Sequence, residues 1–308
     1  MMEISRHMWI DESSKPRFWY GDPPYCENNN VDLAVWDETV ALLGKYKYNL
    51  LLIDVGDGIK YESHPEISAP DAWDKDFLKK KLDEIRALGI TPIPKLNFST
   101  GHDTWLKKYR RMISTPEYYQ VGADLIKEVS EAFGTPELFH LGFDEETPAH
   151  QTNYEMIIVR GEKLWWHDLN YLANQCEKAG TRPWIWSDYI WHHEESFLKN
   201  MSHEIMQSNW YYGRFTDAVA YPEEKNYIAA YETLDKNGYE QIPTCSSWEN
   251  VDNLWQTMAH TQEKLNPELV RGIMVAPWLG TSESGAPGLR CEAERFYNSR
   301  AWIYPETV

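Results

Sequence analysis

Short apolar segments recur along this chain, and stretches with the apolar spacing of helices separate most of them. The clearest is 49–55, an apolar run of the kind that parallel strands show when both faces are buried. The other seven lie at 8–10, 90–97, 139–143, 182–188, 204–210, 241–245 and 272–278. Strands that alternate with helices, with no low-complexity linker between them, predict an α/β chain that forms a single (β/α)8 TIM barrel over residues 1–308.

The helices are expected where apolar residues recur every three to four positions. Pro116 falls in the first turn of one of them, and Gly89 and Gly180 follow the ends of two others, which are the positions these residues favour. The expected helices are 35–46, 76–88, 116–133, 163–179, 223–236 and 251–265.

Charge and apolar content exclude two kinds of partner. The chain has 48 acidic against 30 basic residues, a formal net charge of -18, which argues against nucleic acid and anionic membrane surfaces. No run approaches the ~18 apolar residues of a membrane span. The N-terminus carries no apolar signal core, so we expect a soluble, cytoplasmic protein. Nothing in the sequence indicates its oligomeric state.

The four cysteines give no sign of a metal centre. Cys26, Cys176, Cys245 and Cys291 are far apart and lack metal-ligand spacing. We expect free thiols, most of them buried. With no Gly-rich phosphate loop either, the sequence predicts neither a metal nor an organic cofactor.

Aromatic residues are unusually frequent, with 15 Trp and 19 Tyr, many of them in clusters. Cores use Phe and Leu more readily, because an indole N–H needs a hydrogen-bond partner. The excess therefore suggests a cleft lined with flat, amphipathic rings. Sugars suit such clefts, since their C–H faces stack on rings while their hydroxyls form hydrogen bonds.

One segment concentrates acidic residues at the end of a predicted strand. The apolar run at 139–143 leads directly into Asp144, Glu145 and Glu146. Adjacent acids repel, so a fold that gathers two of them holds one as a proton donor and one ionised, or leaves both in water. A solvated acidic turn is therefore the alternative interpretation.

Polar and aromatic residues also follow the other predicted strands, which a purely structural barrel would not require. In a barrel these strand ends meet at one rim, where active sites lie. The residues at or just past such ends are Asp57, His102, Asp144, Glu145, Trp186, Asp188, Trp210, Trp248 and Glu283.

Several motifs, spread along nearly the whole chain, resemble those of glycoside hydrolase family 20, the β-N-acetylhexosaminidases. The family's His-x-Gly-x-Asp-Glu is similar to residues 140–145, and its third-strand motif resembles 89–102. Weaker similarities lie at 6–11, 47–49 and 64–67. The shared order and spacing of the motifs carries the resemblance more than any one of them.

The chain also departs from the family pattern. Lys95 stands in place of a glutamate and Asn97 in place of an aspartate, and one residue is inserted before Gly101. The family's Trp-x-Glu is represented only loosely, by Trp278 and Glu283. Because the first predicted strand begins at residue 8, we expect a barrel without the family's preceding accessory domain. These departures suggest a distant, minimal relative.

The resemblance implies a reaction in which the sugar's own 2-acetamido oxygen attacks the anomeric carbon, so that no protein nucleophile is needed. Glu145 would be the general acid and then the base, and Asp144 would orient the acetamide. A neighbouring anion is expected to raise the pKa of the acid toward working pH. His102 and Asp57 would support the acid, and Arg6 would grip sugar hydroxyls.

Other positions have weaker assignments. Trp186, Trp210 and Trp278 resemble the aromatic box around the acetamide methyl group, although each alone would more often be a core residue. Trp248 and Asn250 fall where the family has Tyr-x-Asp, so their roles in binding substrate are doubtful. Structural alternatives stay open for two of these residues. His102 could be a structural histidine, and Arg6 could instead form a salt bridge with Asp54 or Asp11. Glu146 and Asp188 either line the pocket or sit in water.

Three hypotheses remain for the function. The first is a retaining exo-β-N-acetylhexosaminidase that releases terminal GlcNAc or GalNAc from a glycan or glycoconjugate. The second is a barrel that binds amino sugars without hydrolysing them. The third is a hydrolase of another sugar that uses an ordinary carboxylate pair such as Glu145 with Glu283.

Overall fold

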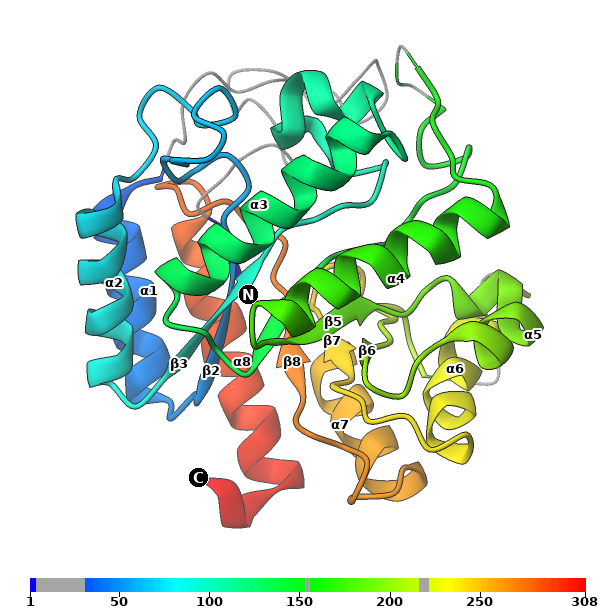
Figure 1. The fold of residues 1–308 in the computed structure, drawn as a ribbon. Coiled ribbons are helices and arrows are strands. Elements are labelled where there is room, and N and C mark those ends of the chain that lie inside the picture. The colour runs from blue at the N-terminus through cyan, green and yellow to red at the C-terminus, as the bar shows by residue number, and fades with distance from the viewer. Residues whose placement is uncertain (4–30, 153, 155, 216–221) are drawn as a thin grey trace.

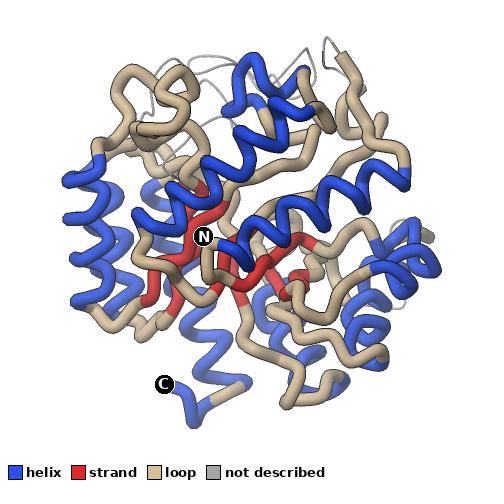
Figure 2. The backbone as a smooth tube through the Cα atoms, in the orientation of Figure 1, coloured by secondary structure: helices blue, strands red, loops and turns tan. Residues whose placement is uncertain are grey.

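The computed structural model describes residues 1–3, 31–152, 154, 156–215 and 222–308. Within them, parallel strands occupy the centre of the molecule and helices surround them (Figure 1 and Figure 2). The predicted strand at 8–10 and the candidate residue Arg6 lie outside the described residues.

Six strands form one parallel sheet in sequence order. Because each strand pairs in parallel with the next, all their carboxyl ends lie at one edge. The strands are β1 Met2–Glu3, β2 Leu50–Asp54, β3 Thr91–Lys95, β4 Leu138–His140, β5 Arg182–Trp186 and β6 Met206–Ser208.

Two further strands, β7 Thr244–Cys245 and β8 Met274–Val275, form a separate parallel pair. Isolated bridges join Gln207 to Gln241 and Trp210 to Thr244, and so bring β7 beside β6. On the other side of this pair, the amino group of Met1 donates to the carbonyl of Val275 at 3.0 Å. Seven of the eight predicted strands are thus confirmed, and each of the seven is shorter than expected.

Helices follow most of the strands, and all six expected ones are present within two residues of their predicted bounds. Side chains of Asp32, Asp74 and Thr115 accept hydrogen bonds from the first turns of α1, α2 and α3. The helices are α1 Leu33–Lys45, α2 Lys75–Ala87, α3 Pro116–Ala132, α4 Glu162–Lys178, α5 Ile190–Asn200, α6 Glu224–Lys236, α7 Asn253–Lys264, α8 Ala286–Ile303 and the 3-10 helices η1 Thr104–Arg111 and η2 Pro305–Thr307. The sequence did not predict α5, α8, η1 or η2. Within the described ranges, no helix combines the length and apolar character that crossing a bilayer requires.

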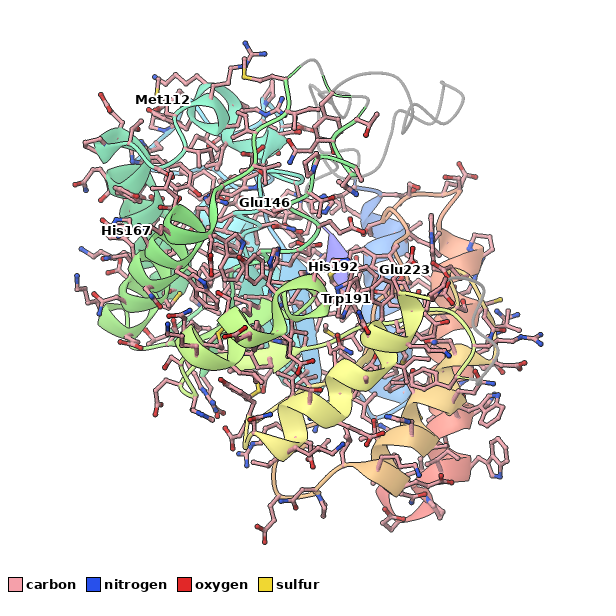
Figure 3. The ribbon with its side chains drawn as sticks, turned by 90° about the vertical axis from the view of Figure 1, so that its right-hand side faces the viewer. Met112, Glu146, His167, Trp191, His192 and Glu223 are labelled. Atoms are coloured by element: carbon pink, nitrogen blue, oxygen red, sulfur yellow. The ribbon has the colours of Figure 1, made fainter. Side chains whose placement is uncertain are left out.

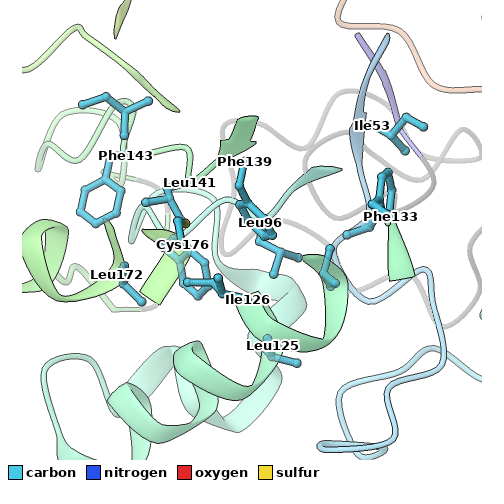
Figure 4. Packing of buried hydrophobic residues seen from close by; sticks show 14 of the residues in the cluster. Ile53, Leu96, Leu125, Ile126, Phe133, Phe139, Leu141, Phe143, Leu172 and Cys176 are labelled. Carbon is cyan, nitrogen blue, oxygen red and sulfur yellow. The ribbon is translucent and has the colours of Figure 1, made fainter. Parts of the chain in front are cut away.

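The core has two layers. One apolar cluster contains side chains from β2 to β8, including Leu52, Trp184 and Met274, so the strands curve around a common interior. A larger cluster packs the other face of the strands against the helices. Figure 4 shows part of it, where Phe139 and Leu141 meet side chains of α3 and α4.

The cysteines of the described chain are free thiols, as predicted. Cys176 and Cys245 are buried, whereas Cys291 is exposed. Burial raises the pKa of both buried thiols, so they act as small apolar residues of the core.

Candidate active site

The turn after β4 presents the acids on a strained backbone. Gly142, Phe143 and Glu145 have positive φ angles of 76°, 71° and 55°. A Cβ atom at Gly142 would lie 1.9 Å from Asn97 Oδ1, so only glycine fits there. The Gly142 N–H donates to His140 Nδ1 at 3.0 Å, and burial keeps the pKa of His140 well below its usual range, so the ring remains a neutral acceptor. Such strain is typical of functional sites.

Asp144 is buried and held by several groups. Its exposed fraction is 4%. Asn97 Nδ2 donates to Asp144 Oδ1 at 2.8 Å, and the Ser99 hydroxyl donates to the Asp144 carbonyl. His102 Nε2 lies 3.4 Å from Asp144 Oδ2. A solvated acidic turn is therefore ruled out for Asp144.

The two departures in the third strand have clear structural roles. An aspartate at position 97 would add a charge that repels Asp144, whereas the amide of Asn97 donates a hydrogen bond to it. Lys95 is fully buried and forms an ion pair with Asp54. Asp54, one of the salt-bridge partners considered for Arg6, is thus already paired.

Glu145 differs from its neighbour, because 34% of its side chain is exposed. Its Oε2 atom lies 3.1 Å from His102 Nε2 and 3.2 Å from His150 Nδ1, and its backbone N–H donates to Asp188 Oδ2 at 2.8 Å. Burial alone would raise the pKa of Glu145, but His102 and His150 outweigh it and lower the pKa. The expectation that a neighbouring anion would raise the pKa of the acid is therefore wrong.

Two neighbours of Glu145 have strongly shifted pKa values. Burial lowers the pKa of His102, but Asp144 and Glu145 overcome this effect and raise it to about 9. Burial, followed by the charge of Asp144, raises the pKa of Asp188 to about 8. One charged imidazole and one protonated carboxyl thus flank the acids near neutral pH.

The structure brings His102 within hydrogen-bond distance of the predicted acid, Glu145. Asp57 is fully buried just after β2, and its Oδ2 atom lies 3.8 Å from Lys107 Nζ. The support of His102 by Asp57 stays a prediction.

The three predicted tryptophans belong to one chain of ring contacts. The rings of Trp186 and Trp278 are 5.8 Å apart, and Tyr212 lies between Trp278, at 6.3 Å, and Trp210, on which it stacks at 5.0 Å. Trp210 Nε1 donates to Asp188 Oδ1 at 3.4 Å, so this aromatic wall reaches the backbone partner of Glu145. Trp186 is fully buried, and a contact between its ring and a substrate stays a prediction. The sequence did not point to Tyr212.

The remaining candidates have other surroundings. Trp248 is 51% exposed, and Glu283 is exposed in the turn after β8. Asn250 Oδ1 accepts from the Asp252 N–H at 3.2 Å, just before α7. Substrate contacts by these residues, and by Arg6 outside the described ranges, stay predictions.

Glu146, labelled in Figure 3, has a side chain that is only 3% exposed, so it does not sit in water. Its carboxylate pairs with Arg160 and accepts from the Thr100 N–H at 3.2 Å. Arg160 Nε also donates to Asp168 Oδ2 at 2.6 Å, and Nη2 donates to the Phe98 carbonyl at 3.2 Å. This buried network, which the sequence did not predict, joins the loops after β3 and β4 to α4.

Comparisons with known proteins give a fold but no assigned family. No family model matches the chain, and no curated protein matches it. Among solved structures, a family 20 chitobiase of Flavobacterium johnsoniae superimposes with a TM-score of 0.61 at 16% identity, over 90% of this chain and 50% of that one. The family 20 β-N-acetylhexosaminidase of Streptomyces coelicolor gives a TM-score of 0.63 at 13% identity, over 99% and 68%.

A family 20 exo-β-N-acetylglucosaminidase of Vibrio harveyi, solved in complex with N-acetylglucosamine, has a TM-score of 0.59 at 14% identity. It is matched over 90% of this chain and 55% of its own. The chain thus spans about half the length of the Flavobacterium and Vibrio enzymes. At such low identity the likeness shows a shared fold, and the activity has to be argued from the site.

Proposed function

We propose that this chain is a glycoside hydrolase, and that it acts as a retaining exo-β-N-acetylhexosaminidase on terminal GlcNAc or GalNAc. The observation that carries the proposal is the unequal pair at the end of β4. Asp144 is buried and held by an amide, while Glu145 beside it reaches solvent between two histidines. One carboxyl group is thus held in a fixed position, and the other is accessible to a leaving group.

The proposal includes a closed (β/α)8 barrel. The bridges between β6 and β7, the hydrogen bond from Met1 to Val275 and the common interior cluster support closure of the eight strands. In a closed barrel, the loops after all the strands surround one opening, and the acids lie on that rim.

In the first step, the substrate's acetamido oxygen attacks the anomeric carbon and the bond to the aglycone breaks. Glu145 delivers a proton to the departing oxygen, and a proton can pass to it from His102 Nε2 across 3.1 Å. Asp144 accepts from the acetamide N–H and stabilises the positive charge of the oxazolinium-like intermediate. In the second step, water attacks the anomeric carbon from the face that the aglycone left, and the bond between that carbon and the acetamido oxygen breaks. Glu145 takes the proton from the water, and the original configuration is restored.

One observation favours a second candidate, a barrel that binds amino sugars without cleaving them. The histidines lower the pKa of Glu145, so the free site holds the acid ionised. Hydrolysis then requires a bound sugar to shift the proton to Glu145. By contrast, the exposed Glu283 gives no particular support to a conventional carboxylate pair.

The test compares turnover of aryl β-GlcNAc and β-GalNAc with that of aryl β-glucoside. Hydrolysis of the N-acetyl substrates only, with strong inhibition by a thiazoline analogue, is the expected result. Binding of GlcNAc without turnover would favour the second candidate. Turnover of the glucoside would support the carboxylate pair and overturn the proposal.

A further inference from the structure

The proposed acid, Glu145, lies beside two histidines, and all three side chains are of types that can bind a metal ion. His102 follows β3, while Glu145 and His150 follow β4. Glu145 Oε2 lies 3.1 Å from His102 Nε2 and 3.2 Å from His150 Nδ1. Each residue offers one ligand atom such that all three lie within 4.8 Å of one another.

These distances fit a tetrahedral transition-metal ion. Nitrogen and oxygen ligands bind Zn²⁺ at roughly 2.1 Å, so two ligands of one tetrahedral site lie about 3.4 Å apart. The separations of 3.1 and 3.2 Å from Glu145 are within a few tenths of an ångström of this value, and the two histidine ligand atoms lie within 4.8 Å of each other. Two imidazoles and one carboxylate select Zn²⁺ or a similar ion over Mg²⁺ and Ca²⁺, which prefer oxygen ligands throughout.

The surrounding residues hold these ligands in place and leave solvent access. The backbone N–H of His150 donates to Thr147 Oγ1 at 3.1 Å. A Cβ atom at Gly101 would lie 3.2 Å from the ring atom Cδ2 of His150, so the two loops pack closely. His102 is 7% exposed, but the side chains of Glu145 and His150 are 34% and 32% exposed. An ion can therefore enter from solvent and keep a fourth position for water.

We propose that His102, Glu145 and His150 bind one Zn²⁺ or similar divalent transition-metal ion, and that the bound ion inhibits the enzyme reversibly. Coordination by His102 releases a proton from that ring to solvent. Coordination by Glu145 removes the carboxylate that must carry a proton to the leaving group. The binding is independent of the reaction, whereas the inhibition rests on the proposed function.

The direct test is calorimetric titration of the chelator-treated full chain with ZnCl₂. One ion per chain is expected, and loss of a ligand in His150→Gln or Glu145→Gln is expected to weaken binding at least about tenfold. The matched control is His167→Gln, which removes an exposed histidine of α4 (Figure 3) whose ring lies 5.5 Å from that of Tyr119. It is expected to bind Zn²⁺ as the unaltered chain does.

Co²⁺ provides a second readout, because a tetrahedral site with two imidazoles gives visible absorption bands that depend on the ligands. Loss of these bands in His150→Gln, with circular dichroism unchanged, supports the site; equal Zn²⁺ affinity and equal Co²⁺ bands in all variants overturn it. In turnover assays, Zn²⁺ is expected to inhibit the unaltered chain and His167→Gln alike. Saturation of this site without inhibition overturns the inhibitory role alone. If no sugar is hydrolysed, the proposed function fails, and calorimetry still decides the binding.

Discussion

The two ends of the strands differ in how their polar groups are used. At the carboxyl ends of β3 to β5, carboxylates and imidazoles crowd together, and several of them share partners. At the amino ends of β2 and β8, there is a cavity of about 720 Å³ whose lining is mainly apolar. Examples of its lining residues are Met2, Leu43, Leu52, Ile242, Met274 and Phe296.

Two of the charged groups that line this cavity already have hydrogen-bond partners. Glu292 accepts from the Ser247 N–H at 2.7 Å, and the Arg300 guanidinium donates to the carbonyls of Lys47 and Tyr46. The cavity could hold a ligand by volume, but it has no converging acids. We therefore expect the reaction at the carboxyl ends of the strands. Titratable groups that shift one another's pKa values are typical of active sites, and an apolar cavity lacks them.

The substitution with the largest expected effect on this comparison is Glu145→Gln. The amide keeps the shape of the side chain but cannot deliver a proton, so kcat on an aryl N-acetylhexosaminide is expected to fall by about 10²- to 10⁴-fold. The melting temperature should stay nearly unchanged, because the side chain is partly exposed. Retention of most activity would show that the proton donor lies elsewhere.

Arg160→Met tests whether the buried ion network holds the carboxyl end together. The substitution leaves Glu146 and Asp168 buried without their cation, at an expected cost of about 3–5 kcal/mol in the free energy of unfolding. The matched control is Arg290→Met, which breaks the pair with Glu38 at 2.8 Å between half-exposed side chains. It should cost about 0–1 kcal/mol. Equal costs in urea unfolding would contradict the structural role of the network.

Asp144→Asn separates the substrate-assisted reaction from a conventional carboxylate pair. Loss of the anion beside the acetamide is expected to lower kcat by about 10²- to 10³-fold, as for removal of one electrostatic stabiliser. Azide should not restore activity, since Asp144 is no nucleophile in the proposed reaction. Formation of a glycosyl azide with rescue of the rate would instead indicate a covalent carboxylate mechanism.

Gly142→Ala addresses the backbone that presents the acids. The new Cβ would lie 1.9 Å from Asn97 Oδ1 at a φ of 76°, so a loss of about 2–4 kcal/mol in stability is expected. Gly89→Ala is the control, because Gly89 has nearly the same φ, 77°, and nothing within 4 Å of the added atom. Its cost should be only about 1 kcal/mol, from backbone strain alone. Thermal unfolding of both variants separates steric contact from φ strain.

Much of this architecture was predictable from local sequence. The run at 49–55 and the helical spacing that precedes most of the strands reflect burial on both strand faces and on one helix face. The acids after β4 and the tryptophans at strand ends were recognisable by their position. In a barrel, residues that follow a strand's carboxyl end lie on the rim where active sites form.

The missing parts depend on contacts between distant segments. Asn97 acquires its role only because β3 pairs with β4, and His150 and Arg160 lie in a polar stretch with no periodicity. The apolar face of α8 is interrupted by the buried Glu292, which weakens its helical pattern. Local patterns carry no information about which partner a buried polar group will find.

Ala293→Leu, at the opposite end of the strands, should have the smallest effect and most directly tests the comparison. Ala293 lines the cavity on α8, where leucine has good helix propensity and a volume of about 720 Å³ leaves room for it. Stability is expected to change by less than about 1 kcal/mol, since cavity filling offsets any local strain. Turnover of the N-acetyl substrates should be unchanged. If Ala293→Leu lowered kcat as much as Glu145→Gln while the fold stayed intact, the cavity would take part in the reaction, and the separation of the two ends would fail.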